Sequence, residues 1–151
     1  MYCNLKVEIN SNTIYLKAII DSGNFLKEPI TKIPVIVVER NSLKDIIPDY
    51  ILNNLDRIIN GEEIDLKKFT PKIRVIPFTS LGKENGLLLG IKADKVIVEL
   101  EENIVNINNV IIGIYNGILS KNDKYKALIG LDLLEIEGGS IENEYIRNIK
   151  V

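Results

Sequence analysis

The stretch IIDSGN, residues 19–24, combines residue types that could carry out acid–base chemistry. Two isoleucines lead into Asp21, which Ser22 and Gly23 follow. A carboxylate at the end of a buried strand is directed toward the interior, where such a group can act as a general acid or base. Asp-Ser-Gly is also a common turn sequence, because aspartate and serine bond their own backbone and glycine accepts a positive φ. The tripeptide alone therefore favours an ordinary turn, and its neighbours in the sequence carry the rest of the information.

Two features of the composition limit the chemistry. The 151 residues include no histidine, which excludes Ser-His and Cys-His catalysis and most zinc sites. The one cysteine, Cys3, allows neither an internal disulfide nor a CxxC metal site, and its strand-like context predicts a small buried or half-buried apolar residue. An enzyme with this composition would use carboxylates, lysines or tyrosines as its acid–base groups.

Length and charge indicate one ordinary globular domain covering residues 1–151. The net charge is −2 with acids and bases interleaved, so no basic block points to nucleic acid. No apolar run approaches the ~20 residues that span a bilayer, and we identify no signal peptide. A fragment of a larger membrane protein would give the same pattern.

Short runs of branched residues predict a mostly β fold that could place Asp21. Residues 5–9 and 14–20 flank the polar stretch NSNT, which predicts a hairpin whose second strand stops at Asp21. The segment PVIVVE, residues 34–39, predicts a buried strand. We expect further strands at 72–78, 86–91, 94–100, 103–107 and 109–115, and an edge strand at 144–151.

In residues 48–61 the apolar residues recur at the spacing of a helix and no longer at that of a strand. Pro48 suits a first helical turn and Gly61 suits a C-terminal stop. The sequence therefore predicts one inserted helix around 48–59, whose apolar positions are Ile51, Leu52, Leu55, Ile58 and Ile59.

A second apolar element, ALIGLDLL at 127–134, lies about a hundred residues after Asp21. Together, Asp21-Ser22-Gly23 and Leu128-Ile129-Gly130 resemble the aspartic peptidases in their single-motif form, the retropepsins. The resemblance implies a closed retropepsin-like β domain, equivalent to half of a pepsin. It also implies that the Leu128-Ile129-Gly130 element packs beneath the catalytic loop and that a short helix follows residue 130. The inserted helix at 48–59 departs from compact retropepsins.

The segments IIDSGN, PVIVVE, IPFTSLGKENGLLLG and VIIGIYNG are similar to the sporulation sigma-E factor processing peptidases of endospore-forming bacteria. That resemblance implies an aspartic endopeptidase that removes the propeptide of a sigma-factor precursor. An activating signalling protein is a further implied partner. The family attaches this domain to a membrane-embedded region that this chain lacks, at the cytoplasmic face of the cell membrane, so we expect a soluble fragment.

The resemblance also implies roles for single residues. Asp21 would be catalytic, and the loop would be supported by Ser22, Gly23 and Asn24. A flap over the substrate would be formed by Leu81, Gly82, Lys83, Glu84, Asn85 and Gly86. Aspartic-peptidase chemistry needs two carboxylates about 3 Å apart that share one proton, so Asp21 would meet Asp21 of a second copy in a homodimer. We expect no metal and no cofactor.

Several other interpretations remain. The segment SLGKENG lacks the spacing of a phosphate loop, and Ser22 has no lysine at a spacing that suggests a base. Asp132 could be mistaken for a second catalytic carboxylate, but we expect a surface or capping role for it. The run VIIG at 110–113 competes with Leu128-Ile129-Gly130 for the place beneath the loop. The alternative function is a non-catalytic binding or dimerisation module with a retropepsin-like fold.

Overall fold

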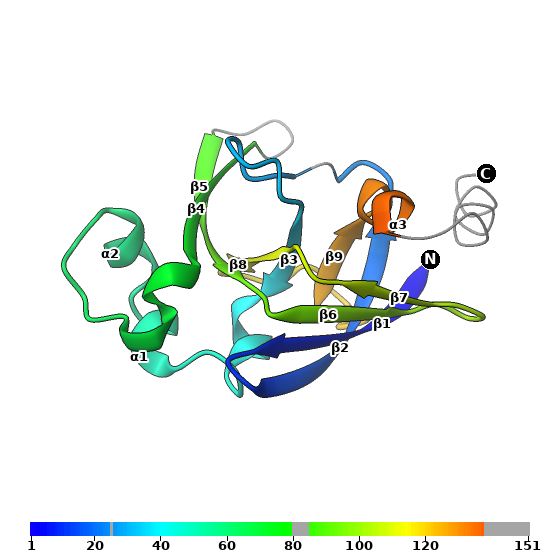
Figure 1. Ribbon diagram of the computed structural model, residues 1–151, viewed down its shortest axis with the longest axis horizontal. Coiled ribbons are helices and arrows are strands. Elements are labelled where there is room, and N and C mark those ends of the chain that lie inside the picture. Colours follow the sequence, from blue (N-terminus) through cyan, green and yellow to red (C-terminus); the bar gives the residue numbers. More distant parts are fainter. Residues whose placement is uncertain (25, 80–84, 138–151) are drawn as a thin grey trace.

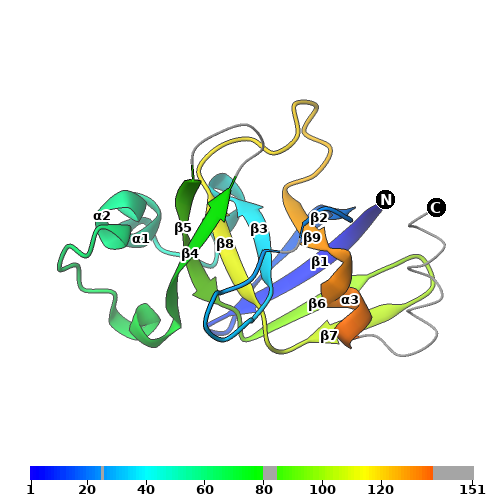
Figure 2. The same ribbon diagram turned by 90° about the horizontal axis from the view of Figure 1, so that it is seen from above.

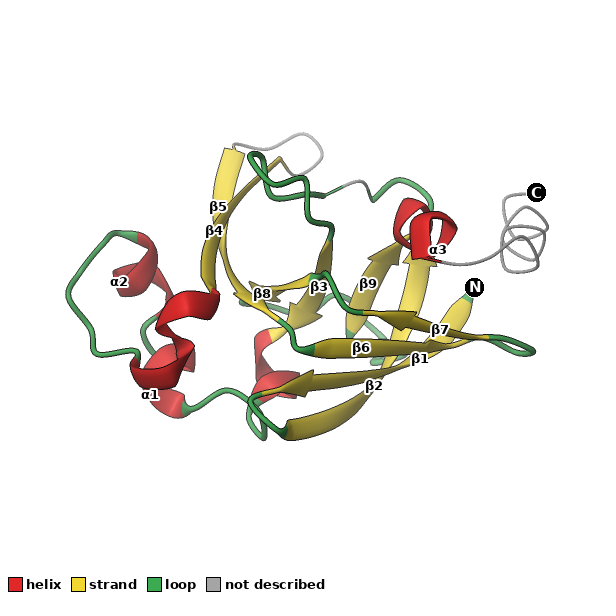
Figure 3. Cartoon of the chain, viewed as in Figure 1, coloured by secondary structure: helices red, strands yellow, loops and turns green. Residues whose placement is uncertain are grey.

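The computed structural model describes residues 1–24, 26–79 and 85–137, and the edge strand expected at 144–151 lies outside them. Within these residues the fold is mostly β, which confirms the sequence prediction (Figure 1 and Figure 3). The strands are β1 Tyr2–Ile9, β2 Asn12–Asp21, β3 Val35–Glu39, β4 Ile73–Thr79, β5 Asn85–Lys92, β6 Lys95–Glu99, β7 Ile104–Ile107, β8 Ile111–Tyr115 and β9 Ala127–Gly130. The helices are α1 Asp49–Leu52, α2 Leu55–Ile59 and α3 Leu131–Glu137, with 3-10 helices at Arg40–Leu43 and Lys67–Lys72.

The nine strands form one mixed sheet in the order β4-β5-β8-β3-β9-β2-β1-β6-β7. Closing a sheet into a barrel requires its first and last strands to pair. The end strand β4 pairs only with β5, and the four-residue β7 pairs only with β6. The sheet is therefore open in the described part of the chain, and the expectation of a closed β domain was wrong.

The predicted hairpin before Asp21 is present as β1 and β2. Its turn residues Asn10 and Ser11 both have positive φ, at 50° and 68°, the backbone that suits a two-residue hairpin turn. Alternate residues of β2 point into the larger of two hydrophobic cores, among them Leu16, Ala18 and Ile20. This alternation fixes the register of β2 and so fixes where Asp21 emerges.

Strand β3 is buried on both faces, as the run of branched residues predicts. Ile36 and Val38 belong to the larger core, whereas Val35 and Val37 belong to a smaller one on the opposite face. A central strand with apolar residues on both faces reads as a continuous hydrophobic run. The smaller core adjoins the side of the molecule where β2 ends.

The segment 48–59 forms two short helices, α1 and α2, and not the single helix that the apolar period predicts. The backbone N–H of Asn54 bonds the carbonyl of Ile51, and its side-chain amide donates to the carbonyl of Tyr50 at 2.8 Å. An uninterrupted helix would use the Tyr50 carbonyl for the Asn54 N–H, so the side chain replaces that bond and the helix ends. The predicted apolar positions Ile51 and Ile58 are nevertheless buried.

The helices lie at two separate places around the sheet. Figure 1 and Figure 2 both show α1 and α2 beside the β4–β5 end of the sheet and α3 at the other side. The short helix expected after residue 130 is confirmed as α3, which follows β9 directly. Among the described residues, no helix is long and apolar enough to cross a membrane.

Candidate active site

Asp21 is the last residue of β2, and a tight turn follows it. Its carboxylate Oδ1 accepts a hydrogen bond from the N–H of Gly23 at 2.9 Å, and its carbonyl accepts one from the N–H of Asn24 at 3.1 Å. Asp21 is half-buried, whereas Ser22 and Gly23 are exposed. Within the described residues no other hydrogen bond holds the carboxylate, so its second oxygen is free to bind a water or a substrate.

Strand β9 lies directly beside this loop. It runs parallel to β2 and places Gly130 next to Asp21 in the register. A Cβ on Gly130 would lie 2.2 Å from the carbonyl oxygen of Asn24 and 2.8 Å from Asp132 Oδ1. No side chain fits there, so glycine is what lets the loop after Asp21 pack onto β9.

The other two residues of the Leu128-Ile129-Gly130 element face opposite sides of the sheet. Ile129 is fully buried in the larger core, and Leu128 is half-buried against the smaller one. The competing run VIIG lies elsewhere: its residues Ile111–Gly113 pair with β3 and β5, and not with β2. The structure thus brings together Asp21 and the later glycine element.

Polar contacts tie the loop to its surroundings. Asn24 Oδ1 accepts a hydrogen bond from the N–H of Leu26 at 3.1 Å, while its Nδ2 is buried with no partner in the described part of the chain. Asp132, on the first turn of α3, forms an ion pair with Lys27 at 3.3 Å, which joins α3 to the segment that follows the loop. The ion pair gives Asp132 a structural contact with this segment, and Asp132 is not among the described residues that line the cavity over Asp21.

The segment after the loop folds around a buried glutamate. The Thr31 hydroxyl and N–H both donate to Glu28, and the N–H of Ile30 also donates to it. These hydrogen bonds hold the pKa of Glu28 below its usual range. The carboxylate therefore stays charged at neutral pH and keeps residues 28–33 folded beside the site.

A cavity of about 370 Å³ opens over Asp21. Gly23 lines this cavity together with four residues that have polar side chains, Asp21, Asn24, Thr79 and Tyr115. The apolar residues of the lining are Leu26, Val37, Phe78, Leu88, Leu119 and Leu128. Half-enclosed apolar walls around one acidic group are typical of a site that binds a side chain beside a reacting bond.

The hairpin of β4 and β5 reaches this cavity. Phe78 and Thr79, at the end of β4, line it, and the Thr79 hydroxyl donates to Asn85 Oδ1 at 2.8 Å. Of the expected flap residues, Asn85 and Gly86 begin β5 opposite Thr79 and Phe78. The other four, Leu81, Gly82, Lys83 and Glu84, lie outside the described residues.

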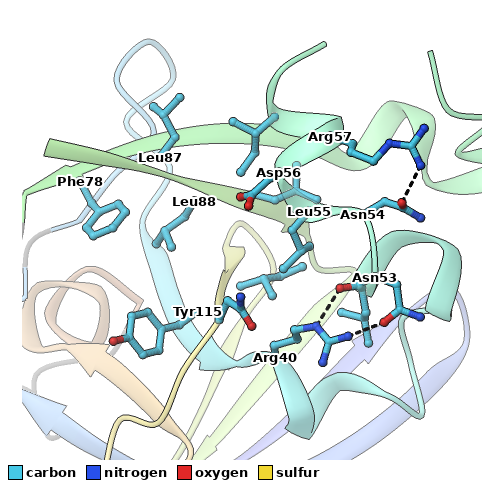
Figure 4. Close-up of a pocket in the computed structure, with 15 residues that line it drawn as sticks. Arg40, Asn53, Asn54, Leu55, Asp56, Arg57, Phe78, Leu87, Leu88 and Tyr115 are labelled. Carbon is cyan, nitrogen blue, oxygen red and sulfur yellow. Dashed lines mark hydrogen bonds between the residues drawn. The ribbon is translucent and has the colours of Figure 1, made fainter. Parts of the chain in front are cut away.

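Two further cavities adjoin the one over Asp21. One of about 560 Å³ shares Leu26, Phe78 and Thr79 with it. The other, of about 660 Å³, lies against α1 and α2 and is drawn in Figure 4. Phe78 lines all three cavities, and Leu88 and Tyr115 line two of them. No motif in the sequence marks these three residues as part of a site.

Possible metal ligands are dispersed in the structure. Among the described residues, no three histidine, cysteine, aspartate or glutamate side chains lie together in a way that could hold a metal ion. The prediction that the chain uses no cofactor stays a prediction.

Comparison with known proteins identifies relatives along most of the chain. The model of a peptidase family described as sporulation factor SpoIIGA matches residues 1–133. The sporulation sigma-E factor-processing peptidase of Priestia megaterium is 33% identical over 136 residues, which cover 88% of this chain and 44% of that protein. The peptidase of the same name from Bacillus subtilis is 31% identical over 130 residues, covering 83% of this chain and 42% of its own length. The chain thus spans less than half the length of these relatives, and no solved structure matches it.

Proposed function

The chain belongs to the sporulation factor SpoIIGA family, and on that premise we propose that it is an aspartic endopeptidase domain that cleaves a sigma-factor precursor. The names of the relatives supply the class of substrate. The carboxylate of Asp21, at the end of β2 and facing an apolar-walled cavity, supplies the chemistry. A retropepsin-like fold is part of the proposal, supported by the tight packing of the Asp21 loop on Gly130.

The proposed mechanism needs a second carboxylate. One member of an aspartate pair takes a proton from the attacking water, and the other, protonated, donates to the oxygen of the scissile carbonyl. Asp21 is the one acidic residue that lines its cavity in the described part of the chain. This single observation carries the proposal of a homodimer, in which the second Asp21 comes from another copy across a two-fold axis. The exposed Ser22 and Gly23 are accessible to such a copy.

The β4–β5 hairpin offers a place for an extended polypeptide. Strand β5 begins at Asn85, but its pairing with β8 begins only at Leu89. Residues 85–88 therefore have a strand partner on the β4 side and none on the β8 side within the described residues. A free strand edge beside a cleft can bind a peptide through main-chain hydrogen bonds, which suits a protein substrate.

The remaining parts of the proposal concern the whole protein. A sigma-factor precursor is the substrate, a signalling protein activates the enzyme, and a region outside this chain anchors it at the cytoplasmic face of the membrane. A role of residues 81–86 as the flap is part of this proposal, and four of these residues lie outside the described ones. Each of these proposals extends the resemblance to the full-length relatives.

Replacement of Asp21 tests the function directly. When an Asp21→Asn variant is co-expressed with a sigma-E precursor, we expect cleavage to fall by at least about a hundredfold, because general acid–base catalysis is lost. Immunoblotting of the precursor and its product measures this. The exposed Asp45 provides a matched control, and Asp45→Asn should process the precursor normally.

Unchanged processing by the Asp21→Asn variant would contradict the proposal. If the unaltered chain binds the precursor without cleaving it, and the full-length protein also fails to cleave it, the chain is instead a binding module. Folding of both variants is checked by circular dichroism, so that a lost fold is not taken for a lost carboxylate.

A further inference from the structure

The cavity against α1 and α2, which we call the helix-side cavity, is the largest of the three cavities described above. Its volume is about 660 Å³, compared with about 370 Å³ for the cavity over Asp21. Its lining includes Leu52 of α1, Leu55 of α2, Leu87 of β5 and Ile114 of β8. Figure 4 labels Leu55 and Leu87. The inserted helices therefore create this space.

The helix-side cavity adjoins the cavity over Asp21. Phe78, Leu88 and Tyr115 line both of them, so these three side chains stand at the boundary. Figure 4 shows Phe78, Leu88 and Tyr115 on one side of the helix-side cavity and Arg40 with Asn53 on the other. A single polypeptide lying along the β5 edge could occupy both cavities at once.

The polar groups at the rim are held by internal bonds. Arg40 donates from Nε to the carbonyl of Leu52 at 2.7 Å and from Nη2 to Asn53 Oδ1 at 2.5 Å. Arg57 donates to Asn54 Oδ1 at 2.9 Å and pairs with Glu62 at 3.2 Å. The rim also carries Asp56 and Asn116, so it is polar, and the aliphatic residues of the cavity lie between these groups.

Some aliphatic residues of the cavity are accessible. Leu87 is 51% exposed to solvent although it lines the cavity, and Leu55 is half-buried. Large aliphatic side chains left open to water inside a concave site gain free energy when another apolar group covers them. The chemistry of these residues therefore favours a large aliphatic or aromatic side chain.

We propose that the helix-side cavity binds a large apolar side chain of the substrate polypeptide at a position away from the scissile bond. The inference rests on the proposed function, because it takes the cavity over Asp21 as the place where the peptide is cut. The inserted helices α1 and α2 then determine which polypeptides are processed. Recognition of a side chain away from the scissile bond would select one precursor among the many polypeptides that contain a cleavable bond.

Kinetics with a purified sigma-E precursor test this proposal. We expect Leu87→Asp to raise KM by about tenfold or more, because the pocket loses an apolar contact and gains a charge, while kcat changes much less. Leu55→Ala should raise KM in the same way without adding a charge. The matched control is Ile104→Asp on β7 at the far end of the sheet, where an aliphatic side chain that is 64% exposed is replaced in the same manner.

A normal KM for both Leu87→Asp and Leu55→Ala, with folded proteins, would overturn the inference and leave the proposed function intact. Loss of the function itself has a different signature, namely full cleavage by Asp21→Asn. The two failures are therefore distinguishable.

Cross-linking gives a measurement that does not require cleavage. A photoreactive benzoyl-phenylalanine is placed at position 87 or 104 of the Asp21→Asn variant, and the precursor is added before illumination. We expect position 87 to cross-link to one precursor segment separated from the cleavage site, and position 104 to give no such product. Cross-links from position 87 to a second copy of this chain, or to residues at the scissile bond, would overturn the inference.

Discussion

At the scale of residues, the proposed chemistry depends on where one carboxylate is held and what surrounds it. Asp21 accepts a hydrogen bond from the N–H of Gly23 through Oδ1, and the residue lines a mostly apolar cavity. Glycine at position 130 is required because a Cβ there would collide with the carbonyl of Asn24. The sequence indicates both residues, because an acid at a strand end and an aliphatic-aliphatic-glycine run are local patterns.

Other residues of the site could not be predicted from the sequence. Phe78, Leu88 and Tyr115 come from β4, β5 and β8, and they meet only because the sheet order places these strands side by side. Each is an aromatic or aliphatic residue of a kind that is common in strands. Such a wall is a property of tertiary structure, so no spacing along the chain reveals it.

Cys3 provides a prediction at this scale. The thiol is buried in the larger core, as the sequence predicts, and its burial raises the pKa to about 12. Because the thiolate is the reactive form, we expect native protein at pH 8 to react with a thiol reagent at least about a hundredfold more slowly than unfolded protein. The colour released by Ellman's reagent, with and without guanidinium chloride, measures both rates. Prompt reaction of the native protein would show that this part of the core opens readily.

At the scale of elements, the strands were predicted well and the inserted helix less well. Period-two patterns and branched runs define β1, β2 and β3, because burial of one or both faces leaves a clear signal. The apolar stripe at 48–59 correctly identifies buried positions. It does not reveal the break at Asn53 and Asn54, because that break comes from a side chain competing for a backbone carbonyl.

The contact between β9 and the Asp21 loop leads to a prediction for Gly130→Ala. The added methyl group would lie 2.2 Å from a backbone oxygen of Asn24, so the loop must shift. We expect a loss of about 1–3 kcal/mol in the free energy of unfolding, together with a fall in cleavage activity. Urea denaturation measures the first effect, and precursor processing measures the second.

Gly61→Ala is the comparison for that experiment. Gly61 has φ of +81°, and a Cβ there meets nothing within 4 Å. The cost in free energy of unfolding should therefore be only the backbone strain of about 1–2 kcal/mol, with activity retained. Equal and small effects at both positions would mean that the packing of the loop on β9 does not position Asp21.

At the scale of the whole molecule, the described chain holds half of the site that we propose. The sheet is open in the described residues, and the Asp21 loop presents exposed residues at the surface. A site completed by a second copy makes activity depend on association, so we expect specific activity to rise with protein concentration. The membrane anchoring that we propose for the full-length protein would raise the effective concentration of the two copies. The sequence indicates the need for a partner carboxylate but does not reveal which surface forms the interface.

Mixing the unaltered chain with the Asp21→Asn variant tests the central claim most directly. The two proteins are combined in equal amounts at a fixed total concentration, left to exchange subunits, and assayed on a sigma-E precursor. If two Asp21 carboxylates are needed in one dimer, random pairing leaves about a quarter of the activity of the unaltered protein. Half of the activity would mean that each chain works with its own Asp21 alone, and the proposed shared site would be wrong.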